Sequence, residues 1–80
     1  MAAYRPLIVK AFWDDEAKVW VATSDDVPGL ATEADSMDAL VKKLKVIIPE
    51  LLDANGYEDG DEVPFALLSQ LTAVAYRHAA

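Results

Sequence analysis

The sequence predicts an α+β fold, a two-layer sandwich in which one helix packs on a four-stranded sheet in the order βββαβ. Three features lead to this prediction. Alternating side chains in 5–13 and 18–23 indicate two strands. Apolar residues at three- and four-residue spacing after Ser36 indicate one helix. A second apolar segment, from Val63 onward, supplies the last strand.

The first two strands form a hairpin. Residues 14–17 are mostly acidic and connect the strands in a loop of ordinary hairpin length. Trp13 and Trp20 lie near the two sides of this hairpin, so a cross-strand or same-face contact between their rings is expected. The pair has two interpretations. The rings either fill the hairpin face as core or anchor an interface on the exposed sheet face.

Residues 24–29 form a turn and lead into a short third strand. Pro28 fixes φ near the value that turns require, and Gly29 permits positive φ. The strand over 30–33 is brief and has an acidic end, which suits the edge of a sheet.

The helix begins after Asp35 or Ser36, either of which can accept a hydrogen bond from a free backbone N–H. Pro49 removes one i→i−4 hydrogen bond and should kink the helix or separate its last turn. Gly56 ends the helix as the natural left-handed residue. The apolar stripe consists of Met37, Leu40, Val41, Leu44, Ile47, Ile48, Leu51 and Leu52.

The end of the chain is an acidic loop, 57–62, followed by an apolar segment from Val63 to Tyr76. Threonine, valine and tyrosine favour a strand for at least the second half of this segment. A helix over Phe65–Ala75 is the competing interpretation, because alanine and leucine are good helix formers. Since the helix carries the chain back over the sheet, the fourth strand is expected beside the first.

Length and composition predict one domain, residues 1–80. The hydrophobic fraction of 54% is high for so small a core, so a homo-oligomer or a protein partner is expected. The absence of cysteine suits the reducing cytoplasm. No segment has the pattern of a signal peptide or a membrane span, and no cofactor is expected.

The net charge of −7 argues against nucleic-acid binding and suits a basic protein partner. The acidic clusters at 14–16, 25–26 and 59–62 fall in predicted loops, which favours a partner-facing surface over an active site. A nuclease that uses these acids with Mg²⁺ or Mn²⁺ is the less favoured alternative. His78 is the single histidine, near the chain end, and no catalytic residue or metal ligand is assigned.

Two segments, DDEAKVWVA at 14–22 and SDDVPGLATEADS at 24–36, resemble the N-terminal domain of HicB-like antitoxins. The shared pattern is an acidic turn, an aromatic strand, a Pro-Gly turn, a threonine before an acidic residue, and a capped helix. The match is nearest to a short stand-alone relative, a domain of unknown function. The resemblance implies a sheet similar to a trimmed ribonuclease H-like fold without its catalytic acids. It also implies that the domain covers a small basic HicA-like toxin that cleaves messenger RNA.

HicB antitoxins usually continue into a DNA-binding module, and this chain ends at Ala80 without one. DNA autoregulation is therefore not expected, and the resemblance makes the leading hypothesis a non-enzymatic protein-binding domain that neutralises such a toxin, associates with itself, or both. A structural homo-oligomer with no toxin partner is the alternative. The expected contact residues are Trp13, Asp14, Asp15, Trp20, Asp25, Asp26, Pro28 and Gly29.

Overall fold

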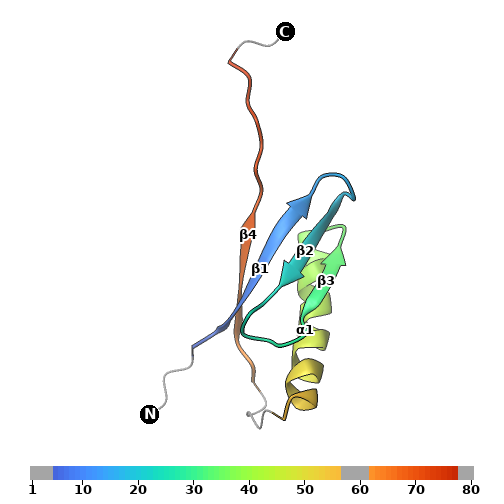
Figure 1. Ribbon diagram of the computed structural model, residues 1–80, viewed down its shortest axis with the longest axis vertical. Coiled ribbons are helices and arrows are strands. Elements are labelled where there is room, and N and C mark those ends of the chain that lie inside the picture. The colour runs from blue at the N-terminus through green and yellow to red at the C-terminus, as the bar shows by residue number, and fades with distance from the viewer. Residues whose placement is uncertain (1–4, 57–61, 78–80) are drawn as a thin grey trace.

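Four strands form one mixed sheet, and a single helix covers one of its faces (Figure 1). The computed structural model describes residues 5–56 and 62–77. The predicted two-layer arrangement and the order βββαβ are confirmed. The elements are β1 Leu7–Asp14, β2 Val19–Thr23, β3 Ala31–Ala34, α1 Met37–Ala54 and β4 Phe65–Gln70.

The strands lie in the order β3-β2-β1-β4. β1 and β2 pair antiparallel, as do β2 and β3, whereas β4 runs parallel to β1 with Leu7 opposite Phe65. The prediction that the fourth strand lies beside the first is therefore confirmed. Trp13 is the cross-strand partner of Trp20, and their rings meet edge to face at a centroid distance of 5.4 Å. The predicted aromatic contact is confirmed as well.

One ridge of α1 forms the core together with small residues of the sheet. Each full burial of a leucine or isoleucine side chain removes enough apolar surface to stabilise the fold by about 1.5–3 kcal/mol. Val9, Ala11 and Ala22 of the sheet are at most 2% exposed. Small side chains let the helix approach the sheet closely. The ridge residues are Leu40, Leu44, Ile48 and Leu52, all from the predicted stripe.

The ends of α1 and its buried residues follow the sequence, but one of the two effects predicted for Pro49 does not occur. The Ser36 hydroxyl accepts a hydrogen bond from Ala39 N–H at 3.1 Å, so Ser36 rather than Asp35 is the cap. Gly56 has φ of 78° and follows the helix end, as predicted. The prediction that Pro49 separates the last turn is wrong, because α1 runs without interruption through Pro49 to Ala54. Pro49 is exposed, and the buried residues on either side of it hold the helix on the sheet.

The last apolar segment forms a strand in its first half. β4 ends at Gln70, and 71–77 continues without strand or helix pairing past the end of the sheet (Figure 1). The prediction of a strand in the second half is therefore wrong, and so is the helix alternative. The pairing of β4 with β1 ends at Phe12 and Gln70, so the tail has no neighbouring strand. The predicted loose end at 1–4, most of the acidic loop and His78 lie outside the described residues.

Candidate binding surface

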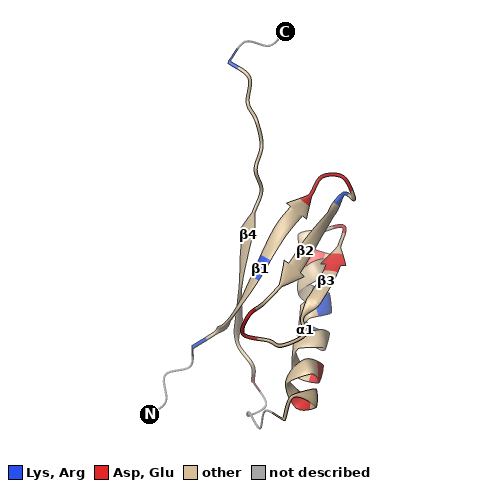
Figure 2. Ribbon diagram, in the orientation of Figure 1, with Lys and Arg blue, Asp and Glu red and all other residues tan. Residues whose placement is uncertain are grey.

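The eight expected contact residues lie in two groups at opposite ends of β2, where the acidic loops are red in Figure 2. Trp13, Asp14, Asp15 and Trp20 surround the β1–β2 hairpin, whereas 25–29 follow the other end of the strand. At about 3.3 Å per residue, this five-residue strand separates the groups by roughly 17 Å. The residues therefore do not form a single cluster.

Asp14 shapes the hairpin loop. Its carboxylate accepts hydrogen bonds from Glu16 N–H and Ala17 N–H, both at 3.1 Å. Lys18 adopts φ of 59° and donates its N–H to the Asp14 carbonyl oxygen at 2.7 Å. Positive φ is uncommon for a residue with a side chain, and the hydrogen bonds of Asp14 hold the loop in this conformation.

Asp15 is the charged group at the hairpin tip. Its Oδ1 accepts a hydrogen bond from Lys18 Nζ at 2.9 Å and from Trp13 Nε1 at 3.2 Å. The Lys18 hydrogen bond, the Trp13 hydrogen bond and the Lys18 charge lower the pKa of Asp15 below its usual value. Both partners of the ion pair are exposed, so this pair orients the side chains and adds little to stability.

The two tryptophans lie on the helix side of the sheet. Side chains alternate along a strand, so Trp13 shares its face with the buried Ala11, and Trp20 shares its face with the buried Ala22. Trp20 packs against the core, and both rings are half-buried. This placement agrees with the core interpretation. The rings therefore lie on the face that α1 covers, and not on the solvent-exposed face of the sheet.

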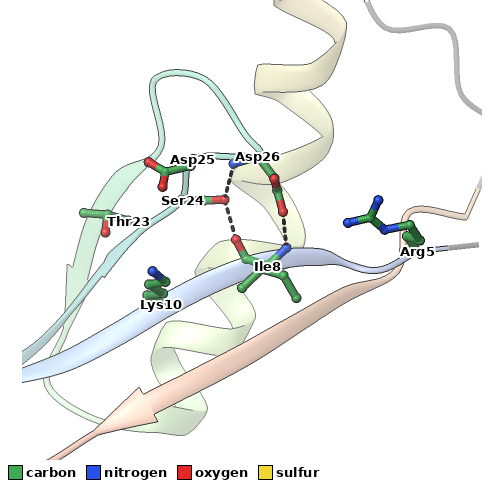
Figure 3. Close-up of a pocket in the computed structure, with 7 residues that line it drawn as sticks. All are labelled: Arg5, Ile8, Lys10, Thr23, Ser24, Asp25 and Asp26. Atoms are coloured by element: carbon green, nitrogen blue, oxygen red, sulfur yellow. Dashed lines mark hydrogen bonds between the residues drawn. The ribbon is translucent and has the colours of Figure 1, made fainter.

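At the other end of β2, Ser24 and Asp26 clamp the beginning of β1 (Figure 3). Asp26 Oδ2 accepts the Ile8 N–H at 2.7 Å, and Ser24 Oγ donates to the Ile8 carbonyl oxygen. The same Oγ accepts from Asp26 N–H at 3.0 Å and from Val27 N–H at 3.2 Å. Because β2 pairs with β1 only as far as Lys10, these side chains replace the missing strand partner of Ile8. Sequence reasoning assigned Ser24 to a turn and missed this role.

The Pro28-Gly29 turn packs against the C-terminal half of α1. Gly29 has φ of 85°, and a Cβ there would lie 3.7 Å from Leu51 Cδ2. Leu30 N–H donates to the carbonyl oxygen of the buried Val27 at 3.1 Å, which closes the turn. The turn therefore fixes the path between β2 and β3 beneath the helix.

The face of the sheet opposite the helix is open to solvent and carries apolar side chains around Lys10, which lies between Thr23 and Leu68. The register places Phe12 of β1 between Val21 of β2 and the end of β4 on this face. Phe12 is 45% exposed and Leu68 is 53% exposed. The alternation along β1 indicated this face, but the predicted contact residues did not include it.

One shallow hollow, of about 280 Å³, is lined by Arg5, Ile8, Lys10, Thr23, Ser24, Asp25 and Asp26 (Figure 3). A second, of about 310 Å³, is lined by Lys10, Ala11, Phe12, Leu68, Ser69 and Gln70.

The described acids do not converge on a metal site. Within residues 5–56 and 62–77, no three histidine or carboxylate side chains lie close enough together to hold a metal ion. The acids at 14–16 and 25–26 lie at opposite ends of β2. No helix in the described part of the chain is both long enough and apolar enough to cross a membrane.

Comparisons with known proteins show a family of undetermined role. Residues 6–77 match the family described as "Domain of unknown function (DUF1902)". The crystal structure of a hypothetical protein from the extremely thermophilic bacterium Thermus thermophilus is similar, with 51% sequence identity and a TM-score of 0.69. The similarity covers 90% of this chain and 99% of that one. No curated protein matches the chain.

Proposed function

Because the chain belongs to the DUF1902 family, a family defined without an activity, we propose its function from its surface: a non-enzymatic protein-binding domain of the HicB antitoxin type. Its partner is a small basic protein, by resemblance an RNA-cleaving toxin of the HicA type. The absence of cysteine suits binding in the cytoplasm.

The observation that supports the proposal is the open sheet face, where exposed apolar side chains lie beside Lys10 and carboxylates lie at both ends of β2. Phe12 and Leu68 are the exposed apolar side chains of this face. Exposed carboxylates flank it at both ends of β2, with Asp15 and Glu16 at one end and Asp25 at the other (Figure 2). Protein interfaces commonly combine an apolar centre with a polar rim. With a net charge of −7, the rim attracts a basic partner during diffusional encounter.

The acids differ in how free they are to meet a partner. Asp14 and Asp26 bind backbone N–H groups of their own chain, and Asp15 binds Lys18. Within the described residues, the Asp25 carboxylate has no hydrogen-bond partner, although Arg5 and Lys10 line the same hollow. Asp25 is therefore the acid whose replacement tests binding without disturbing the fold.

Two exposed sites on the proposed surface have matched controls on the outer side of α1. Phe12→Asp changes the apolar centre, and Val46→Asp makes the same kind of change at a residue that is 60% exposed. Asp25→Lys reverses a rim charge, and Asp53→Lys does so on the exposed side of the helix.

The full chain is used to capture binding proteins from native extract, and the affinity of each variant for the captured protein is then measured. Phe12→Asp should weaken binding at least tenfold, equivalent to about 1.4 kcal/mol. Asp25→Lys should slow association and reduce its salt dependence. The two controls should bind as the unaltered chain does. A complex that is indifferent to salt, to Asp25→Lys and to Phe12→Asp contradicts the proposal. A chain that retains no basic protein and associates only with itself supports the structural homo-oligomer instead.

A further inference from the structure

β4 lies at an edge of the sheet, and the direction of its free backbone groups can be worked out. Leu7 N–H donates to the Pro64 carbonyl oxygen at 3.0 Å. In a strand, the N–H and C=O of one residue point to the same side, and successive residues alternate. The even-numbered residues of β4 therefore point their backbone groups at β1. Phe65, Leu67 and Ser69 point theirs away from the sheet. The binding of both Ile8 backbone groups on the β2 side of β1 agrees with this alternation.

The tail at 71–77 continues β4 beyond the end of the sheet (Figure 1). Leu71 is 57% exposed, Val74 73% and Tyr76 82%. From Phe65 to Tyr76 the chain contains no charged residue (Figure 2), although the protein carries a net charge of −7. Natural edge strands are commonly protected by charge, proline or a covering element. Residues 65–76 of this edge and tail have none of these in the described structure, and the first charge after them is Arg77.

We propose that a second copy of this chain covers β4, so that the tail of each copy pairs antiparallel with β4 of the other. β4 has six residues, and the uncharged tail supplies the six residues 71–76 to lie beside it. Joining the two edges merges the four-stranded sheets of the copies into one continuous sheet. Neither β4 nor 71–76 carries a charge, so two acidic copies can pair through them without charge repulsion at the contact. A basic partner is instead attracted to the carboxylates at the ends of β2. The inference does not depend on the proposed toxin binding.

Symmetry sets the register of this pairing. A two-fold axis perpendicular to the sheet keeps every side chain on its own face, so opposed residues must both be odd-numbered or both be even-numbered. An axis at Leu71 places Leu71 opposite its own copy and Val74 opposite Leu68. It also places Ala73 opposite Ser69, where both backbones point toward each other. Leucine and valine side chains then oppose apolar ones, Thr72 opposes Gln70, and the helices of both copies lie on the same face of the joined sheet.

The first test is the oligomeric state of the full chain by sedimentation at several concentrations. Ala73→Pro removes an N–H that points at the partner copy, so it should weaken dimerisation at least tenfold. Thr72→Pro is the matched control, because its N–H points away from the partner, and it should leave the dimer intact. Both positions are exposed and lie outside the helix and strands, so circular dichroism should show an unchanged fold.

A cysteine pair tests the register, since the chain has no cysteine of its own. The Leu71→Cys variant should form a disulfide-linked dimer under mild oxidation. In the Val74→Cys variant the two sulfur atoms are six residues apart along the strand, roughly 20 Å, and should not link. A chain that stays monomeric at about 0.1 mM overturns the proposal, as does an Ala73→Pro variant that dimerises as tightly as the unaltered chain. Cross-linking through Val74→Cys but not Leu71→Cys also overturns it. If Ala73→Pro loses the dimer but still binds the basic partner, self-association and toxin binding are shown to use different surfaces.

Discussion

Replacing Asp26 with alanine removes the carboxylate that accepts the Ile8 N–H at 2.7 Å. A hydrogen bond to a charged group contributes about 1.5–3 kcal/mol when water cannot replace it. Asp26 is exposed and Ile8 is half-buried, so water partly replaces the lost acceptor. We therefore expect Asp26→Ala to lower the free energy of unfolding by about 1 kcal/mol. In a domain of this size, that loss lowers Tm by about 4–8 °C.

Asp25→Ala is the matched control, because it removes the same charge from the neighbouring residue without removing a hydrogen bond. Its effect should stay within about 0.5 kcal/mol, as for most exposed substitutions. Thermal and urea unfolding followed by circular dichroism, at one protein concentration, gives both values. Hydrogen exchange at the Ile8 amide should accelerate in Asp26→Ala alone. Equal stability of the two variants, or unchanged protection of the Ile8 amide, would refute the clamp at the start of β1.

Three further outcomes are expected. Gly29→Ala should lower the free energy of unfolding in urea by about 1–2 kcal/mol, because alanine is strained at φ of 85°, whereas its Cβ would meet Leu51 at an ordinary 3.7 Å. Gly29→Asn should recover part of this loss. A Gly29→Ala variant as stable as the unaltered chain would contradict the strain. Leu44→Ala should cost about 2–5 kcal/mol, because it empties a fully buried position, and a loss below this range would mean that the core collapses around the gap. Lys18→Met should raise the pKa of Asp15 toward its usual value in an NMR titration, because Lys18 is the main cause of the lowered pKa. The stability linked to this ion pair is present above the unfolded-state pKa of Asp15 and is lost as pH falls through the lower folded-state pKa. If the pKa of Asp15 is the same in Lys18→Met as in the unaltered chain, the pair does not form in solution.

The parts of the fold that local pattern determines could be predicted from the sequence. Alternation identified β1 and β2, and helical spacing identified the residues of α1 that are buried. The end of the chain could not be predicted in the same way, because 63–76 contains no charged residue and would present apolar side chains on both faces of a strand. Which half becomes a strand depends on how far the segment stays beside β1: β1 runs to Asp14, but the two diverge after Phe12 and Gln70 (Figure 1).

The roles of the acids were harder to predict than the elements that carry them. Asp14 binds N–H groups two and three residues away, a local pattern that turn chemistry can suggest. Asp26 binds the N–H of Ile8, a residue 18 positions earlier that comes close only after the sheet has formed. Composition shows an acidic surface but cannot show which carboxylates already have partners within the chain.

The parallel pairing of β1 with β4 affects how the protein is made. β2, the antiparallel neighbour of β1, follows it after a short loop, whereas β4 follows only after β3 and α1. The second neighbour of β1 arrives only when Phe65 and the following residues have been synthesised, since Leu7 pairs with Phe65. Until then one side of the central strand stays open to passing chains, and closing so long a loop is slow. Pairing of β4 should therefore be a late step in folding, and the open side of β1 should be the place where wrong pairing with other chains most readily begins.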